Sequence, residues 1–300
     1  MWSEELYRIM GYDLELPPPS FSEMSSCYTP DSWNRLSDAV NEALNSGAYY
    51  ELDLEIVRPD GVKRHTSVRG EADYDINCNI VKLYGTVQDI TERKEVEASL
   101  RETLQRLRTV TGSVIDVIVM AVESRDPYTS GHQKRVSDLA QAIASEMGLP
   151  MQQAEGIRLA GLVHDLGKIS IPTEILSTPR KMSELEYSLV QTHSQNGYDI
   201  LKEVDFDWPV AQMVYQHHER LDGSGYPRGL KGDDIILEAK IIAVADVVEA
   251  IASHRPYRPA LGINTALEEI EHQQGVLYDP IVVGACLQLF RKQGYQLCEA

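Results

Sequence analysis

The chain has 300 residues, of which 43% are hydrophobic and 25% are charged, as in an ordinary soluble globular protein of about two domains. Its 28 basic and 46 acidic side chains give a formal net charge of −18 at pH 7. Nucleic-acid polymers and anionic membrane surfaces both require a basic surface, so neither is an expected partner. We expect a cytoplasmic protein because no transmembrane run, signal peptide or metal-type cysteine spacing is present.

Residues 1–92 are predicted to form a small α+β domain. Gly11 and Gly47 mark the ends of two helical patterns, and Pro59-Asp60-Gly61 indicates a turn between strands. Between the helices and that turn, apolar and acidic residues alternate with a period of two, as a half-buried strand requires. Two helices and three antiparallel strands are expected, at residues 2–12, 30–46, 51–56, 62–70 and 80–88.

This order of elements, followed by Asp89-Ile90-Thr91 and a charged helix, resembles the later part of a PAS sensor domain. The resemblance implies two earlier strands, so the domain is either truncated at its start or an abbreviated copy. No cysteine motif of a flavin photosensor is present, and His65 alone does not indicate haem. We therefore predict no PAS cofactor, and a domain that serves dimerisation or signal relay.

Residues 93–125 are predicted to form one long linker helix. Its apolar positions step by four and three residues in alternation, which is the seam of a coiled coil. The seam residues are Leu100, Leu104, Leu107, Thr111, Val114, Ile118 and Ala121. This spacing favours a homodimer, and the alternative is one amphipathic helix packed on its own domain.

Residues 112–300 are predicted to form an all-α bundle that overlaps the end of the linker helix. The capping box Ser183-x-x-Glu186 opens one helix, whose face is expected to carry Leu185, Leu189 and His193. Asp279-Pro280 caps the last helix. Four further helices are expected, at residues 136–147, 154–165, 210–219 and 238–253.

Seven potential metal ligands lie in this bundle, on five of its expected helices, which could direct them into one central site. They are His132, His164, Asp165, His193, His217, His218 and Asp246. An isolated helical histidine is more often a packing or surface residue, which we assume for His254 and His272. Imidazole and carboxylate ligands suit Fe, Mn, Zn or Ni. An adjacent pair whose aspartate can bridge predicts a two-metal centre, the usual apparatus for hydrolysing a phosphodiester.

Together, His132, His164-Asp165 and Asp246 resemble the ligand series of HD-domain phosphohydrolases. The segment from His217-His218 to Gly225-Tyr226-Pro227 resembles the signature of the HD-GYP subfamily. The match extends over about residues 112–292. It implies a metal-dependent phosphodiesterase that hydrolyses the bacterial second messenger cyclic di-GMP.

The resemblance implies a role for each matching residue. The first metal is expected on His132, His164, Asp165 and Asp246, and Asp165 is expected to bridge to a second metal on His193, His217 and His218. His164, Asp165 and Lys168 are the expected catalytic residues. The substrate contacts are expected from Lys168, Asp222, Gly225, Tyr226, Pro227, Arg255 and Arg258. Lys168 would reach the scissile phosphate and Tyr226 would stack on a guanine, while Asp222 would either orient a ligand or form a turn.

Family members with three metals carry a glutamate at the position of Tyr128, so we expect two divalent ions here. Iron or manganese is the first expectation, with zinc or nickel as alternatives. A two-metal member is expected to open the ring to linear pGpG, and further cleavage to GMP stays open. The alternatives are a cyclic dinucleotide sensor with little turnover, signalling through partners such as GGDEF-domain proteins, and a hydrolase of cyclic GMP-AMP.

Overall fold

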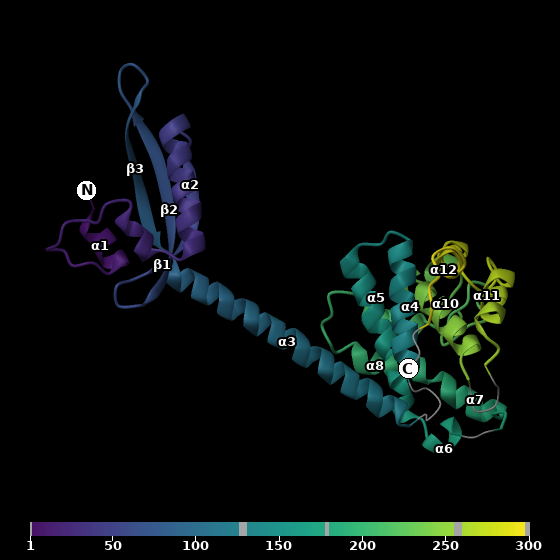
Figure 1. Ribbon diagram of the computed structural model, residues 1–300. Helices are drawn as coiled ribbons and strands as arrows, with labels where there is room; N and C mark the ends of the chain where they lie inside the picture. The colour runs from purple at the N-terminus through teal and green to yellow at the C-terminus, as the bar shows by residue number, and fades with distance from the viewer. Residues whose placement is uncertain (1, 126–130, 178–179, 255–259, 298–300) are drawn as a thin grey trace. The chain divides into compact units, whose positions relative to one another are not determined.

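The computed structural model describes residues 2–125, 131–177, 180–254 and 260–297. The chain divides into two compact units, Met1–Thr109 and Val110–Ala300. The long helix α3 (Thr91–Glu123) starts in the first unit and ends in the second, as its path in Figure 1 shows.

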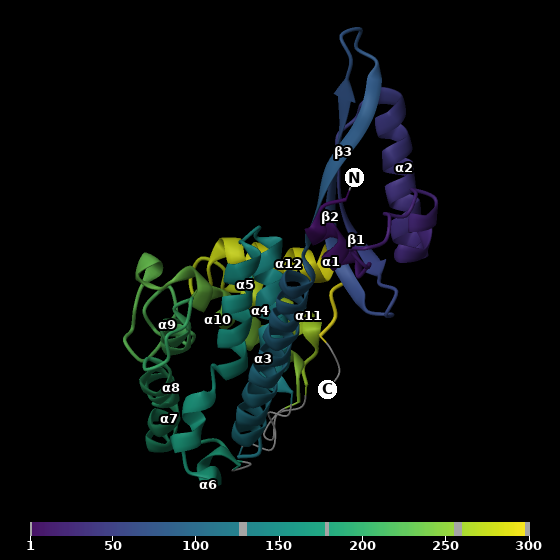
Figure 2. The same cartoon turned by 90° about the vertical axis from the view of Figure 1, so that its left-hand side faces the viewer.

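The first unit is a three-stranded antiparallel sheet with helices, as the sequence predicts. Leu54 and Ile56 of the first strand and Val68 of the second are buried, and polar residues alternate with them. Helix α2 lies along the strands in both views (Figures 1 and 2) and packs on the first two of them. The elements are α1 (Glu4–Met10), η1 (Glu23–Cys27), α2 (Pro30–Ser46), β1 (Tyr50–Val57), β2 (Lys63–Tyr74) and β3 (Ile80–Asp89), with sheet order β1-β2-β3.

Glycine ends both helices of this unit. Gly11 and Gly47 have φ values of 72° and 73°, which belong to the left-handed region that glycine adopts without strain. The backbone N–H of Gly47 donates to the carbonyl of Ala43 and closes the last turn of α2. The predicted ends of both helices are therefore confirmed.

The predicted seam of α3 is exposed over its first turns. Leu100, Leu104 and Leu107 keep 58%, 49% and 57% of their surface accessible. Three large apolar side chains on one face of a helix are costly to leave in water. In the part of the chain that the structure describes, this face is exposed, so it is available to bind another surface.

The second unit is the predicted helical bundle, built around α10 (Leu237–Ala252). This helix buries nine residues and packs on helices from both ends of the unit's sequence. No helix in the described part of the chain, α10 included, is long and apolar enough to cross a membrane. The others are α4 (His132–Glu146), α5 (Met151–Val163), η2 (Leu166–Ser170), α6 (Thr173–Leu176), α7 (Glu184–Gln191), α8 (His193–Leu201), α9 (Val210–Gln216), η3 (Gly232–Asp234), α11 (Ile263–His272) and α12 (Pro280–Lys292).

One predicted helix is wrong. The capping box of Ser183 and Glu186 opens α7, but α7 ends at Gln191 and His193 begins a separate helix, α8. Thr192 separates the two helices, and its hydroxyl donates to the carbonyl of Leu189 at 2.7 Å, a local bond that competes with the helical ladder. Because of this break, His193 is buried while Leu189 stays exposed.

Two more helices end earlier than the sequence predicts. The helix expected over 154–165 ends at Val163, and the one expected over 210–219 ends at Gln216. Each leaves its histidine at the helix end, because the chain then turns into η2 or into a loop. Helix ends therefore hold most of the potential ligands.

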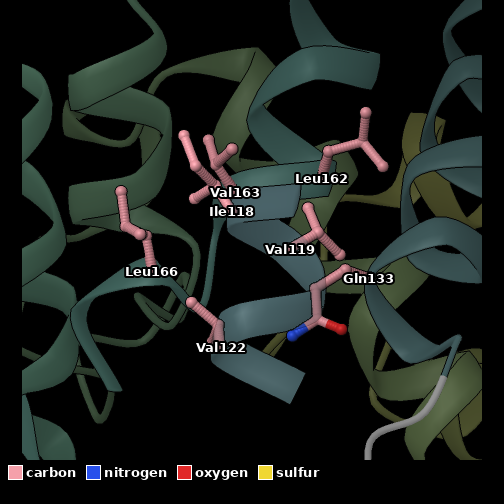
Figure 3. Close-up of a pocket in the computed structure, with 7 residues that line it drawn as sticks. All are labelled: Ile118, Val119, Val122, Gln133, Leu162, Val163 and Leu166. Carbon is pink, nitrogen blue, oxygen red and sulfur yellow. The ribbon is translucent and has the colours of Figure 1, made fainter. Parts of the chain in front are cut away.

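A narrow apolar crevice lies between the end of α3 and the segments α4, α5 and η2. Figure 3 shows its side chains facing one another, and they are Ile118, Val119, Val122, Gln133, Leu162, Val163 and Leu166. Neither amide atom of the buried Gln133 has a hydrogen-bond partner among the described residues.

Gly167 allows η2 to approach α8. A Cβ atom at this position would lie 1.9 Å from the carbonyl oxygen of His193 and 2.5 Å from the nitrogen of Gly197. Both neighbours are backbone atoms that cannot rotate away. The approach places the segment that starts at Asp165 directly beside the start of α8.

Gly167→Ala is therefore expected to destabilise the second unit by about 1–3 kcal/mol, the usual cost of overpacking. Gly284 lies inside α12 with open space around it, so Gly284→Ala is the matched control and is expected to stabilise by up to about 1 kcal/mol. Urea unfolding of the full chain measures both changes. Equal unfolding free energies for the two variants would contradict the close packing of η2 on α8.

Candidate metal centre

The structure brings all seven candidate ligands together within the second unit. Each belongs to at least one of three groups whose ligand atoms lie within 4.8 Å of one another. All are buried except His218, which is partly buried. The groups are His193 with His217 and His218, His132 with His164 and Asp246, and His164 with Asp165 and His217.

Most of these residues lie at the ends of helices. His132 and His193 are the first residues of α4 and α8, while His164 and His217 follow the last residues of α5 and α9. Asp246 differs because it lies inside the buried helix α10. Side chains at helix ends from different parts of the sequence thus meet at one point.

Backbone carbonyls orient three of the histidines. The Nδ1 atoms of His164, His193 and His217 lie 2.7, 2.7 and 2.6 Å from the carbonyl oxygen three residues earlier in the chain. A neutral imidazole that donates from Nδ1 keeps the lone pair of Nε2. All three rings therefore offer Nε2 as a ligand atom, the arrangement typical of metal-binding histidines.

Asp165 lies at the centre of the cluster, and its two oxygens face different partners. Oδ1 lies 3.6 Å from Nε2 of His193, while Oδ2 lies 3.6 Å from Nε2 of His164 and 3.8 Å from Nε2 of His132. Lys168 Nζ donates to Oδ2 at 2.7 Å. The two oxygens of the carboxylate therefore face different sets of histidines.

Asp246 approaches the cluster from α10. Its Oδ1 lies 3.3 Å from Nε2 of His132 and 3.9 Å from Nε2 of His164, and its Oδ2 lies 4.0 Å from Nδ1 of His218. On the other side of Asp165, the Nε2 atoms of His193 and His217 are 3.3 Å apart. Because both rings donate from Nδ1 to a carbonyl, both of these Nε2 atoms are available as ligand atoms.

The buried setting controls the charge of these groups. Burial lowers the pKa of His193 and lowers the pKa values of His217 and His218 well below the ordinary value, so these rings stay neutral. Burial alone would raise the pKa of Asp165, but the positive charge of Lys168 holds that pKa well below its usual range. Neutral imidazoles and an ionised carboxylate are the forms that bind metal.

His132 is the exception. Burial acts to lower its pKa, but hydrogen bonds to Asp246 and Glu249 raise the pKa to about 9. A ligand histidine must be neutral, so metal binding at His132 is coupled to the release of a proton.

Sequence reasoning missed Glu249. This carboxylate is fully buried on α10, one turn after Asp246, and its Oε2 forms a short contact with Nδ1 of His132. The three-residue spacing from Asp246 was a signal, because residues three apart lie on one face of a helix. That spacing alone could not identify the partner on α4.

Glu219 was missed as well. It follows the histidine doublet, and its two oxygens accept the backbone N–H groups of Arg228 at 2.8 Å and Leu230 at 2.9 Å. The buried carboxylate therefore holds the loop that contains Tyr226 against the histidines. The two N–H groups belong to a loop that folds back onto Glu219. No local sequence pattern indicates such a pairing.

The expected substrate-side residues occupy different settings. The ring of Tyr226 lies 4.6 Å from that of His218 and covers the cluster. Asp222 is exposed, and its Oδ1 accepts the backbone N–H of Ser224 at 2.8 Å, which favours its turn-forming alternative.

Gly225 is packed tightly, since a Cβ atom there would lie 2.4 Å from the nitrogen of Arg220. Pro227, two residues later in the same loop, is exposed. Tyr128, Arg255 and Arg258 lie outside the described residues.

Two family models match the chain. One is described as an HD domain and matches residues 116–282, more than half of the chain, and the other is described as a PAS fold and matches residues 1–87. These ranges contain the metal-ligand cluster and the three-stranded sheet, respectively.

Several known proteins are similar to this chain. The cyclic di-GMP phosphodiesterase response regulator RpfG of Xanthomonas campestris is 40% identical over 211 residues, 70% of this chain and 53% of that protein. The 3'3'-cGAMP-specific phosphodiesterase 1 of Vibrio cholerae is 40% identical over 54% of this chain and 37% of its own length. A cyclic di-GMP phosphodiesterase of Thermotoga maritima is 40% identical over 59% of this chain and 48% of its own length.

The chain spans about half or less of the length of these relatives. The resemblance seen in the His-Asp series and in the segment ending at Tyr226-Pro227 is nevertheless confirmed over the helical unit. The chain belongs to the HD domain family, in its HD-GYP branch, and carries a PAS fold ahead of that domain.

Proposed function

We propose that the chain is a metal-dependent phosphodiesterase that opens cyclic di-GMP to linear pGpG. The observation that carries the proposal is the placement of Asp165, whose two oxygens face two separate sets of histidines. Two of the three relatives named above are cyclic di-GMP phosphodiesterases, which supports the choice of substrate.

The donor set fits two divalent ions. His132, His164, Asp165 and Asp246 would hold the first, and Asp165 with the second group of histidines, His193, His217 and His218, would hold the other. Nitrogen and oxygen donors of this kind suit iron or manganese, with zinc and nickel as alternatives. The chemistry that such a pair supplies is a water of strongly lowered pKa at neutral pH.

The side chains around the centre would bind and orient the substrate. Lys168 places a positive charge 2.7 Å from Asp165, within reach of a phosphate that enters the centre. Tyr226 presents an aromatic ring beside His218, where a guanine could stack. Asp222, Gly225 and Pro227 would shape this loop, and Arg255 and Arg258 are proposed as further phosphate or guanine contacts.

A second substrate is favoured by one comparison. A relative of equal identity is named as specific for 3'3'-cGAMP, another cyclic dinucleotide with two purines. Both molecules contain the phosphodiester on which the metal centre would act. Discrimination between the two substrates would therefore depend on contacts to the bases. Relative turnover of the two cyclic dinucleotides decides between them.

Substitution of the central pair tests the proposed reaction. His164→Ala and Asp165→Ala each remove a ligand, and the loss of several kcal/mol of charge stabilisation predicts at least about 100-fold slower hydrolysis of cyclic di-GMP. His272→Ala, on the exposed face of α11, is the control and should leave turnover unchanged. Chromatography of products from the manganese-loaded chain measures the rates and separates pGpG from GMP.

Unchanged turnover in both central variants would overturn the assignment. Tight binding of cyclic di-GMP by the wild-type chain with negligible product would instead identify a sensor.

We infer that the chain forms a homodimer through α3. Leu100, Leu104 and Leu107 lie on one seam with alternating steps of four and three residues, and all three are about half exposed. A seam of this spacing is complementary to a second copy of itself, because equivalent positions meet in a parallel pair. The second copy is therefore the proposed occupant of this face.

The end of α3 would carry a signal to the metal centre. The crevice residues that α3 contacts flank the proposed ligands in sequence: Gln133 follows His132, Leu162 and Val163 precede His164, and Leu166 follows Asp165. A shift of α3 against the crevice residues (Figure 3) would therefore act on the segments of His132 and His164-Asp165, two of the three that would hold the first metal. This is the proposed route by which the PAS fold regulates the enzyme.

A charge on the seam tests the dimer. Leu104→Glu would place like charges opposite each other in a coiled coil and is expected to yield a monomer. Gln105→Glu adds the same charge one position away, off the seam, and should leave a dimer. Light scattering after size-exclusion chromatography measures the mass of the 33.7 kDa chain and its dimer. Equal masses for the two variants would reject the seam as the interface.

A further inference from the structure

Glu249 is a buried carboxylate beside the metal centre. It does not belong to the three groups of potential ligands found among the described residues. Its side chain has no exposed surface. A buried carboxylate is costly unless it is paired and hydrogen-bonded, so its partners show what it does.

The two oxygens of Glu249 have different partners. Oε1 accepts Nε of Arg135 at 2.8 Å and the hydroxyl of Ser253 at 2.7 Å, and Nη2 of Arg135 lies 2.7 Å away. Oε2 instead contacts Nδ1 of His132. Arg135 and Ser253 therefore hold the carboxylate in place, and its second oxygen is directed at the histidine.

His132 is the first residue of α4 and directly follows Gly131, whose φ of 70° lies in the left-handed region. The other three oriented histidines donate from Nδ1 to a carbonyl three residues earlier. At His132 the acceptor for Nδ1 is instead the carboxylate of Glu249, which lies on α10.

Two carboxylates of α10 thus hold the two ring nitrogens of His132. Nε2 lies 3.3 Å from Oδ1 of Asp246, and Nδ1 contacts Glu249 one turn later on the same helix. With Nδ1 held by Glu249, Nε2 faces Asp246 and Asp165. The rotation of the ring is fixed by the same pair.

We propose that Glu249 is a positioning residue that sets the orientation and tautomer of His132 for the first of the two metal positions. The proposal rests on the metal centre proposed above, and it does not depend on which phosphodiester is hydrolysed. It predicts a selective effect, because the contact of Glu249 is with His132, a ligand expected at the first metal position.

Glu249→Gln tests the proposal through metal binding. An amide keeps the size of the side chain, but its NH₂ group meets donors from Arg135, Ser253 or His132 wherever it points. We expect the affinity of one manganese equivalent to fall about 10–100-fold, the usual effect of removing such a partner, while the other equivalent keeps its affinity. Glu268→Gln removes the same charge from the exposed surface of α11 and is the control.

Competition with a chromophoric chelator measures both affinities in the full chain, and the electron paramagnetic resonance signal of a coupled manganese pair reports whether both positions fill. A merely structural role would lower the melting temperature of the metal-free chain and weaken both equivalents together. That result, or two unchanged affinities, would overturn the proposal.

Glu249→Asp covers the case in which the glutamine variant does not fold. It keeps the charge for Arg135 but withdraws the carboxylate from His132 by one methylene. Selective weakening of one equivalent again supports the proposal, and unchanged affinities in the folded aspartate variant reject it. Metal affinity is read without any substrate, so a chain that fails to hydrolyse cyclic di-GMP would reject the proposed function and leave this test standing.

Discussion

The structure of the second unit depends on a buried carboxylate that is surrounded by nitrogen ligands. Asp165 lies among His132, His164 and His193, with Lys168 as a permanent cation beside it. Burying an ionised carboxylate is unfavourable without compensation. Two divalent ions would balance the carboxylates and use the histidine lone pairs, so the same feature accounts for the charge and for the chemistry.

The bundle meets this demand by placing ligands at helix ends. Histidines that start or follow a helix can point their rings across the interior, and nearby carbonyls or Glu249 then fix which nitrogen faces the centre. Gly167 allows η2 to reach the backbone of His193, which brings Asp165 beside the second set of histidines. The loop after His218 is tied back by Glu219, so Tyr226 covers the same cluster.

Features set by local chemistry could be predicted from the sequence. Gly47 ends a helix because glycine alone adopts the left-handed backbone without strain, and the capping box at Ser183 is complete as expected. The ligand set was recognisable because metal chemistry restricts the residue types. Contacts between distant elements could not be predicted: the break at Thr192 depends on a side-chain bond, and the pairing of Glu249 with His132 depends on how α10 packs on α4.

In the proposed centre, two ions share Asp165. Anomalous diffraction from crystals of the manganese-loaded chain tests this sharing most directly. Two peaks are expected, one bonded to each oxygen of the Asp165 carboxylate, with His132, His164 and Asp246 on one side and His193, His217 and His218 on the other. A single peak, or two peaks that do not share Asp165, would contradict it.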